Sequence, residues 1–159
     1  MDELFEVMTL IQTGKAQVVP IVLIDAKGGT YWKTWYRFVK DHLFRLGLIS
    51  EDDFFLFSVT DDLDEAVEEI TGFYRNFHSY RYVGKKLVMR LHHAITPELL
   101  GKLNAEFLDL IEEGAFHTSD ALPEERDEPH LKDLPRLLFA KKKGKSGRFR
   151  QMIDFINRA

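Results

Sequence analysis

The sequence predicts an α/β protein that begins with part of a parallel sheet covered by helices. Two short apolar runs, residues 18–25 and 54–59, have the continuous hydrophobic character of strands that are buried on both faces. Helical periodicity precedes and follows these runs, so strands and helices alternate over residues 1–77. That alternation favours a parallel sheet with helical cover, and a change of rhythm near residue 78 indicates a small α+β extension over residues 78–159.

A helix is predicted over residues 1–13, directly ahead of the first strand. Apolar side chains recur in it at the spacing of one buried face, and these are Leu4, Val7, Met8 and Ile11. Acidic side chains that suit the positive end of a helix dipole occupy its opening turns, and these are Asp2, Glu3 and Glu6. The chain therefore opens on the second half of a strand–helix–strand unit, with no strand ahead of the helix in this sequence.

The following elements continue the same alternation. A turn at Gly28 and Gly29 leads from the first strand into a helix over residues 31–46, because glycine tolerates the positive φ that tight turns need. The second strand, residues 54–59, then leads into a helix over residues 63–77. Each helix presents one apolar stripe, as expected for helices that lie on a sheet.

Strands and helices no longer alternate one for one after residue 78. Predicted strands cover residues 80–83, 86–91, 115–119 and 135–140. Helices are predicted over residues 96–113 and 148–158, with a proline-containing loop over 121–134 and a basic turn over 141–147. We therefore expect two domains, residues 1–77 and residues 78–159.

Composition limits the classes of function that the chain can serve. Its 159 residues, of which 45% are hydrophobic, suffice for a packed core, and a formal charge of −4 argues against a general binder of nucleic acid. The absence of cysteine excludes disulfides and cysteine-ligated zinc and fits a cytoplasmic location. No apolar run approaches the ~20 residues of a membrane span, and the acidic start does not resemble a secretory signal.

Glu3 is the first candidate for chemistry. In α/β folds a helix N-terminus at the carboxyl ends of parallel strands is a common place for nucleotides, because its free N–H groups and dipole favour phosphate. A carboxylate there could bind ribose hydroxyls or stabilise positive charge that develops at a sugar carbon. The alternative is that Asp2, Glu3 and Glu6 only complement the helix dipole.

The start of the chain resembles a known family. Residues 1–15, MDELFEVMTLIQTGK, followed by Pro20-Ile21-Val22-Leu23, are similar to the segment after the glycine-rich loop of the LONELY GUY family, also called the lysine-decarboxylase-like Rossmann proteins. The signature of that family is Pro-Gly-Gly-x-Gly-Thr-x-x-Glu, of which Met1-Asp2-Glu3 supplies the final three positions. The resemblance is strongest over residues 1–30 and extends to residue 77.

The resemblance implies a fold and an activity. The fold would be the C-terminal half of a Rossmann-like parallel sheet, followed by the α+β extension. The activity would be that of a nucleoside 5′-monophosphate phosphoribohydrolase, which uses water to split AMP-like or cytokinin nucleotides into base and ribose 5-phosphate, without metal or cofactor. The signature glutamate is the catalytic one, so Glu3 is the only catalytic residue that carries over.

The rest of the implied active site has no counterpart in this sequence. The phosphate loop would precede Met1, so the nucleotide-binding residues stay unknown, and the family's catalytic arginine matches no position here. We therefore expect the chain alone to be inactive. Lysine decarboxylase activity itself has no support, because no site for a pyridoxal-phosphate lysine is recognisable.

Partners follow from the same resemblance. We expect a nucleoside monophosphate as the ligand, and self-association or pairing with a missing N-terminal half, because a half sheet leaves an edge and an apolar face uncovered. The alternative to an enzyme is a non-catalytic module of the same family for nucleotide sensing or oligomerisation. No membrane partner is expected.

Three other patterns carry less weight. His92 and His93 lack an acidic partner at the spacing of a metal site, so no metal is expected. The lysines of the basic turn would serve an RNA-binding protein, but on an acidic chain they favour a solvated turn. The aromatic side chains of the second helix, Trp32, Trp35 and Tyr36, are typical of core or interface packing.

Overall fold

The computed structural model describes residues 1–159 and divides them into two compact units. The first unit comprises Met1–Phe73 and Lys143–Gln151, and the second comprises Tyr74–Lys142 and Met152–Ala159. The first holds a two-stranded parallel sheet and the second a four-stranded antiparallel sheet, so the predicted α/β class is confirmed. The domain boundary near residue 78 stays a prediction.

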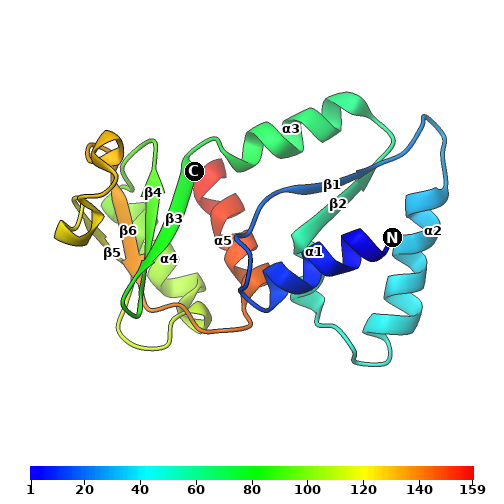
Figure 1. Ribbon diagram of the computed structural model, residues 1–159, viewed down its shortest axis with the longest axis horizontal. Helices are drawn as coiled ribbons and strands as arrows, with labels where there is room; N and C mark the ends of the chain where they lie inside the picture. The colour runs from blue at the N-terminus through cyan, green and yellow to red at the C-terminus, as the bar shows by residue number, and fades with distance from the viewer. The chain divides into compact units, whose positions relative to one another are not determined.

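The first unit alternates helices and strands (Figure 1). Its main elements are α1 (Asp2–Gln12), β1 (Ile21–Ile24), α2 (Tyr31–Phe38), β2 (Phe57–Thr60) and α3 (Leu63–Phe73). β1 and β2 run parallel, with Ile21 opposite Phe57 and Ile24 opposite Thr60. β1 begins directly after Pro20, a residue that has no backbone N–H to offer a neighbouring strand.

The core of the first unit forms where α1 and α2 cover the same face of the sheet. Leu23 and Phe57 point from the two strands into a buried cluster with Trp35 and Val39 of the second helical segment. Side chains of α1 pack against this cluster, and these are Leu4, Phe5 and Met8. The other face of β1 and β2 contacts α3 (Figure 1). The predicted helical cover of the sheet is therefore present on both faces.

The second strand begins three residues later than predicted. Residues Glu51–Leu56 form a 3-10 helix, which takes up the first part of the run that the sequence assigned to the strand. The Asp53 carboxylate holds this turn, because it accepts hydrogen bonds from the backbone N–H and the hydroxyl of Ser50, at 2.8 and 3.0 Å. It also accepts one from the side chain of Gln12 in α1, at 2.9 Å. A local cap therefore outweighs the β propensity of the aromatic residues.

Two helices of the first unit are also shorter than predicted. The helix expected over residues 31–46 is α-helical only to Phe38 and continues as a π-helix over Val39–Phe44. The helix expected to reach residue 77 ends at Phe73, because the chain turns there and Phe77 is the first residue of a strand.

The second unit is built on an antiparallel sheet in the order β3-β4-β6-β5. Its strands are β3 (Phe77–Val83), β4 (Lys86–Leu91), β5 (His117–Ser119) and β6 (Arg136–Phe139). Helix α4 (Pro97–Glu106) belongs to this unit, and α5 (Ser146–Arg158) contributes its last part to it. All four predicted strands exist, although β3 starts earlier than expected and β5 starts later.

The prediction of a helix over residues 96–113 is wrong beyond Glu106, where α4 ends. The Asn104 side chain donates to the carbonyl of Phe116 and accepts from its N–H, at 3.1 and 2.9 Å, which turns the chain back. A 3-10 turn over Leu108–Leu110 follows, and Glu112 then donates its N–H to Ala140 at 2.8 Å. The last predicted turn of helix is therefore replaced by pairing beside the sheet.

The core of the second unit is fully closed. The central strands β4 and β6 carry apolar side chains with no solvent exposure, and these are Leu87, Val88, Met89, Leu91 and Leu137. Leu103 of α4 is equally buried. Across the whole chain, none of the helices combines the length and apolar character that crossing a bilayer requires.

Candidate functional site

Glu3 lies in the first turn of α1 and its side chain is exposed. The N-terminus of α1 is at the same end of the first unit as the carboxyl ends of β1 and β2 (Figure 1). No side chain caps this helix, and the neighbouring Asp2 pairs with the terminal ammonium group, whose hydrogen bond lowers the pKa of that carboxyl. The structure thus leaves the Glu3 carboxylate open to solvent where a ligand of a parallel sheet would bind.

The loop after β1 is held by the carboxylate of Asp25. This group accepts hydrogen bonds from the backbone N–H groups of Ala26 and Tyr31, at 2.9 and 2.8 Å. It lies so close to Gly29 that a Cβ atom there would be 2.3 Å from the Asp25 carboxyl carbon. Gly28 adopts a positive φ of 77°. The turn predicted at the two glycines is therefore confirmed, and Asp25 is the reason that Gly29 has no side chain.

The loop after β2 reaches across to the first loop. Asp61 accepts hydrogen bonds from the Gly28 N–H at 2.8 Å and from Lys33 Nζ at 3.3 Å. The pKa of the Asp61 carboxyl lies below its ordinary value. The main cause is the hydrogen bond from the Gly28 N–H, and the second is the hydrogen bond from Lys33. Asp62 pairs with Lys27 at 3.2 Å. The two loops at the carboxyl ends of the strands are therefore joined by carboxylates that lysines neutralise.

This pair of loops is not predicted as a unit from the sequence. No functional role is predicted there for Asp61, Lys33 or Asp25. The available signal was a carboxylate directly after each of two parallel strands, because the carboxyl ends of such strands meet at one edge of the sheet. The position of Glu3 at the same end was predicted, but its catalytic role stays a prediction.

The aromatic residues of α2 mainly serve packing. Trp35 is buried and contacts Phe5 and Phe57, at ring distances of 5.7 and 5.1 Å. Trp32 donates its indole N–H to the carbonyl of Ile24, at 3.0 Å, and so closes the end of β1. A cavity of about 80 Å³ lies beside Trp35, between α1 and α2, and is lined mainly by apolar side chains. The predicted core packing is therefore confirmed for Trp35.

The histidines of the second unit do not form a metal centre. His78 and His92 lie with ring centroids 5.3 Å apart, and burial, followed by the charges of His92 and nearby arginines, lowers the pKa of His78. Adjacent His92 and His93 lie in a bend just after β4 rather than within the strand. No group of three His, Asp or Glu side chains is arranged to hold a metal ion.

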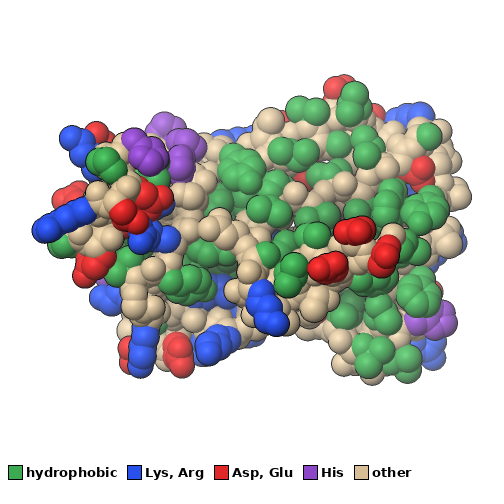
Figure 2. Space-filling view, in the orientation of Figure 1, with side chains coloured by type: hydrophobic (Ala, Val, Ile, Leu, Met, Phe, Trp, Pro, Cys, Tyr) green, Lys and Arg blue, Asp and Glu red, His purple; other side chains and the backbone are tan.

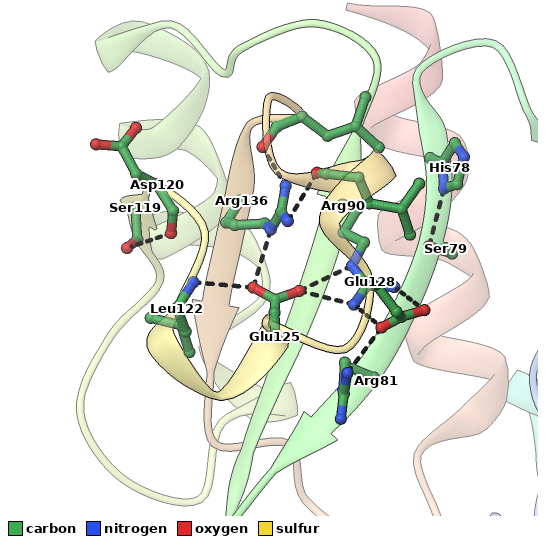
Figure 3. Close-up of polar contacts among 12 residues, drawn as sticks. His78, Ser79, Arg81, Arg90, Ser119, Asp120, Leu122, Glu125, Glu128 and Arg136 are labelled. Carbon is green, nitrogen blue, oxygen red and sulfur yellow. Dashed lines mark hydrogen bonds and ion pairs between the residues drawn. The ribbon is translucent and has the colours of Figure 1, made fainter.

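A buried carboxylate joins two arginines in the second unit (Figure 3). Glu125 Oε1 accepts from Arg90 Nε and Nη2, at 2.9 and 2.7 Å, and its Oε2 accepts from Arg136 Nε and the Leu122 N–H, at 3.1 and 3.0 Å. Burial opposes ionisation of Glu125, but these hydrogen bonds outweigh it and lower its pKa. Both of its oxygens are occupied, so Glu125 fixes the loop over residues 121–134 and has no oxygen left for catalysis.

The basic turn near residue 141 is less exposed than the sequence suggested. Lys141 is half-buried, and burial lowers the pKa of its ammonium group. Its backbone forms an isolated antiparallel bridge with Ile111. The methylene chain of a half-buried lysine packs against apolar surface. Lys141 therefore contributes to the packing of the fold. The RNA-binding interpretation of this turn has no further observation in its favour.

Comparison with known proteins connects the first unit to one family. Residues 1–70 match the family described as possible lysine decarboxylase. The match covers α1, both strands of the parallel sheet and most of α3. No curated protein and no solved structure matches the chain. The matched segment therefore contains Glu3 and both loops at the carboxyl ends of the strands.

Proposed function

We propose that this chain supplies part of the active site of a nucleoside 5′-monophosphate phosphoribohydrolase. The observation that carries the proposal is the family match over residues 1–70, since the matched segment includes the helix that holds Glu3. The substrate class would be AMP-like or cytokinin nucleotides. The reaction is hydrolysis of the bond between the base and ribose 5-phosphate, and it needs no cofactor.

The position of Glu3 suits such a reaction. As the base leaves, positive charge develops at the sugar carbon, and an ionised carboxylate beside it stabilises that charge. Water then forms the new bond to this carbon, while the base takes the electron pair of the broken bond and a proton. The exposed carboxylate of Glu3 at the start of α1 is free of the ion pairs that occupy Asp61 and Asp62.

The chain alone would not complete this site. Its sequence contains no Pro-Gly-Gly-x-Gly-Thr segment to hold the substrate phosphate at a helix N-terminus. A segment that carries this loop would supply the missing groups. We therefore expect no release of adenine from AMP by the purified chain, and release under these conditions would contradict this account.

The decisive experiment adds the motif that this sequence does not contain. A fusion would place a strand and a Pro-Gly-Gly-x-Gly-Thr loop from this family ahead of Met1, and adenine release from AMP would be measured by chromatography. Activity that is lost in Glu3→Gln and retained in Glu6→Gln supports the proposal, because both glutamates are exposed on α1. Equal activity of the Glu3→Gln and unchanged fusions would refute the role of Glu3.

A non-catalytic module is the second candidate. The observation in its favour is that the first unit exposes a large number of apolar side chains, as a module for assembly would. Such a module would bind AMP in the fused form without hydrolysing it. Isothermal titration with AMP, run beside the hydrolysis assay, separates the two candidates.

A further inference from the structure

The cavity beside Trp35 belongs wholly to the first unit. Side chains of α1, of the helical segment over residues 35–43 and of residues 49–57 line it. Most of these side chains are apolar, and they include Phe5, Met8, Val39, Leu43, Ile49 and Leu56. Phe57, the first residue of β2, also lines it, so the cavity lies at the amino end of that strand. Glu3 lies at the carboxyl ends of the strands, so the cavity is separate from the candidate active site.

Trp35 brings an unused hydrogen-bond donor to this cavity. Its side chain lines the cavity and is 3% exposed, and its indole N–H has no acceptor in the chain. Trp32, the other tryptophan, donates its N–H to the carbonyl of Ile24 at 3.0 Å. A buried donor without a partner costs free energy, and an indole N–H can only donate. An acceptor from outside the chain would therefore gain a hydrogen bond at Trp35.

The other polar side chains around the cavity hold its walls together. Gln12 donates to the Asp53 carboxylate at 2.9 Å, and Thr9 donates its hydroxyl to the carbonyl of Phe5 at 2.7 Å. Asp53 also accepts from the backbone N–H and the hydroxyl of Ser50. These bonds tie α1 to the turn ahead of β2, so the cavity is formed before any ligand enters. Small-molecule sites are usually preformed in this way.

The helical wall of the cavity has an uncommon geometry. The chain continues from α2 as a π-helix over Val39–Phe44, and Val39 and Leu43 of this segment line the cavity. In a π-helix the hydrogen bonds span five residues instead of four, and such segments are rare and frequently lie at functional sites. The wall geometry therefore favours a binding site over a gap left by imperfect packing.

The volume of the cavity limits the size of its ligand. A water molecule occupies about 30 Å³ in the liquid, and an apolar cavity of roughly 150 Å³ binds benzene. The cavity beside Trp35 measures about 80 Å³. We therefore expect a molecule smaller than benzene, with roughly four or five non-hydrogen atoms.

The walls also limit the charge of the ligand. Apolar walls disfavour any ion, because a charge loses its hydration there. An anion would in addition meet the carboxylate of Asp53 and the acidic side chains that Figure 2 shows over α1. A neutral molecule avoids both costs. A carbonyl oxygen accepts without donating, so it matches the lone donor of Trp35.

We propose that this cavity binds a small neutral ketone or ester, whose carbonyl oxygen accepts the hydrogen bond of the Trp35 indole N–H. The alkyl groups of the ligand would pack against Met8, Leu43 and Ile49. This binding does not depend on the hydrolase reaction. It also depends on no segment outside residues 5–57, because every residue that lines the cavity lies in that range.

NMR of the ¹⁵N-labelled full chain tests the site with 2-butanone as the probe. Two tryptophans give two indole N–H signals, which Trp35→Phe assigns. We expect a saturable downfield shift of the Trp35 indole proton, with a dissociation constant of roughly 1–10 mM. The Trp32 signal should stay in place, because its N–H is already bonded. A Trp35 signal that does not move, or two signals that drift together without saturation, would overturn the proposal.

Variants of the chain locate the bound ketone. Leu43→Phe fills the cavity and should weaken binding at least about tenfold. Leu46→Phe makes the same change at a side chain that is 70% exposed, and it should bind as the unchanged chain does. Val39→Ile adds one methyl group to the same wall and replaces Leu43→Phe if the larger ring prevents folding. Unchanged affinity in a folded cavity-filling variant would overturn the proposal.

The donor itself is tested by following the ketone instead of the indole group. Saturation-transfer NMR on the protons of 2-butanone measures binding to Trp35→Phe, which keeps an aromatic ring and lacks the N–H. The affinity should fall roughly three- to tenfold, as expected for one lost hydrogen bond. Equal affinity in Trp35→Phe would refute the role of the indole N–H. A water contact to this N–H that saturating 2-butanone does not displace would show that the cavity holds water only.

Discussion

The two sheets of this chain differ in how completely they bury their strands. All four residues of β6 in the antiparallel sheet are buried, whereas β1 of the parallel sheet has one buried residue and ends on the exposed Ile24. The charged side chains of the two units also differ in burial. In the second unit Glu125 and two arginines saturate one another in the interior, while Glu3 in the first unit stands exposed. The second unit thus has two central strands with almost wholly buried side chains, whereas both strands of the first unit are edge strands.

This difference separates side chains that stabilise the fold from side chains that a ligand can reach. A buried ion pair that is fully hydrogen-bonded fixes a loop and leaves nothing for a ligand. An exposed carboxylate at a helix N-terminus suits the helix dipole, and it is also accessible to a substrate or a partner. Substitutions in the two units test this contrast, and the largest effect is expected in the interior of the second unit.

Replacing Glu125 by glutamine should destabilise the chain most. The change leaves Arg136 buried without a counter-charge and leaves Arg90 with Glu128 as its only carboxylate partner, which costs about 3–5 kcal/mol of unfolding free energy. Urea unfolding followed by circular dichroism measures this loss. A loss below about 1 kcal/mol would mean that the cluster contributes no more than a surface ion pair.

Truncating one strand residue in each sheet compares their cores directly. Leu137 on β6 is 0% exposed, so Leu137→Ala should cost about 2–5 kcal/mol through lost burial and a new cavity. Ile24→Ala on β1 should cost less than about 1 kcal/mol, because much of that side chain is already in water. Equal losses in urea unfolding would show that β1 is covered in solution.

An added methyl group at Gly29 should disturb the loop after β1. Its Cβ would meet the Asp25 carboxylate, which would have to give up its hydrogen bonds to the loop, at a cost of about 1–3 kcal/mol. Gly101→Ala in α4 is the matched control. No atom lies within 4 Å of its new Cβ, and alanine favours a helix over glycine by up to about 1 kcal/mol. Thermal unfolding should therefore shift in opposite directions for the two variants.

Acid should weaken the second unit through Glu125. The folded-state pKa of this carboxyl lies below its ordinary value of 4.5, so its contribution to stability is complete above that pH. The contribution is lost as the pH falls from 4.5 through the lower folded-state pKa. Urea unfolding at a series of pH values should show this loss in the unchanged chain and a flatter profile in Glu125→Gln. Identical profiles would contradict the assignment.

The smallest effect is expected at the rim of the same cluster. Asp127 pairs with Arg81 at 2.8 Å, but its side chain is 63% exposed. Solvent screens such a pair, so Asp127→Asn should change the unfolding free energy by less than about 1 kcal/mol. A loss comparable to that of Glu125→Gln would mean that exposure does not separate the two carboxylates.

Periodicity in the sequence sufficed for most of the fold. The continuous apolar run before Asp25 and the alternation of helix and strand in the first half predicted a parallel pair of strands, which β1 and β2 form. Two of the errors have a common physical origin, because side-chain hydrogen bonds outweighed local propensity. Asp53 holds a 3-10 turn where aromatic residues favoured a strand, and Asn104 ends a helix whose apolar stripe continues beyond it.

The candidate site was only partly predictable. A glutamate in the first turn of a helix identified Glu3, and the helix does begin at the carboxyl end of the sheet. The bonds from Asp61 to Gly28 and Lys33 link residues about 30 positions apart. The cluster of Glu125, Arg90 and Arg136 likewise depends on the register of the antiparallel sheet, in which Arg90 faces Arg136. Tertiary pairing of this kind leaves no periodic signal in the sequence.

Pro20 limits the length of the open strand edge, from which aggregation could start. Proline stands directly ahead of β1, where it offers no N–H, and Trp32 occupies the carbonyl at the other end of the strand. The open edge is therefore limited to Ile21–Ile24, too short a template for the long ladders that build fibrils. Pro20 acts as a gatekeeper of the kind that flanks aggregation-prone segments. Replacing Pro20 would lengthen the exposed strand, so a concentrated sample of the chain would aggregate sooner.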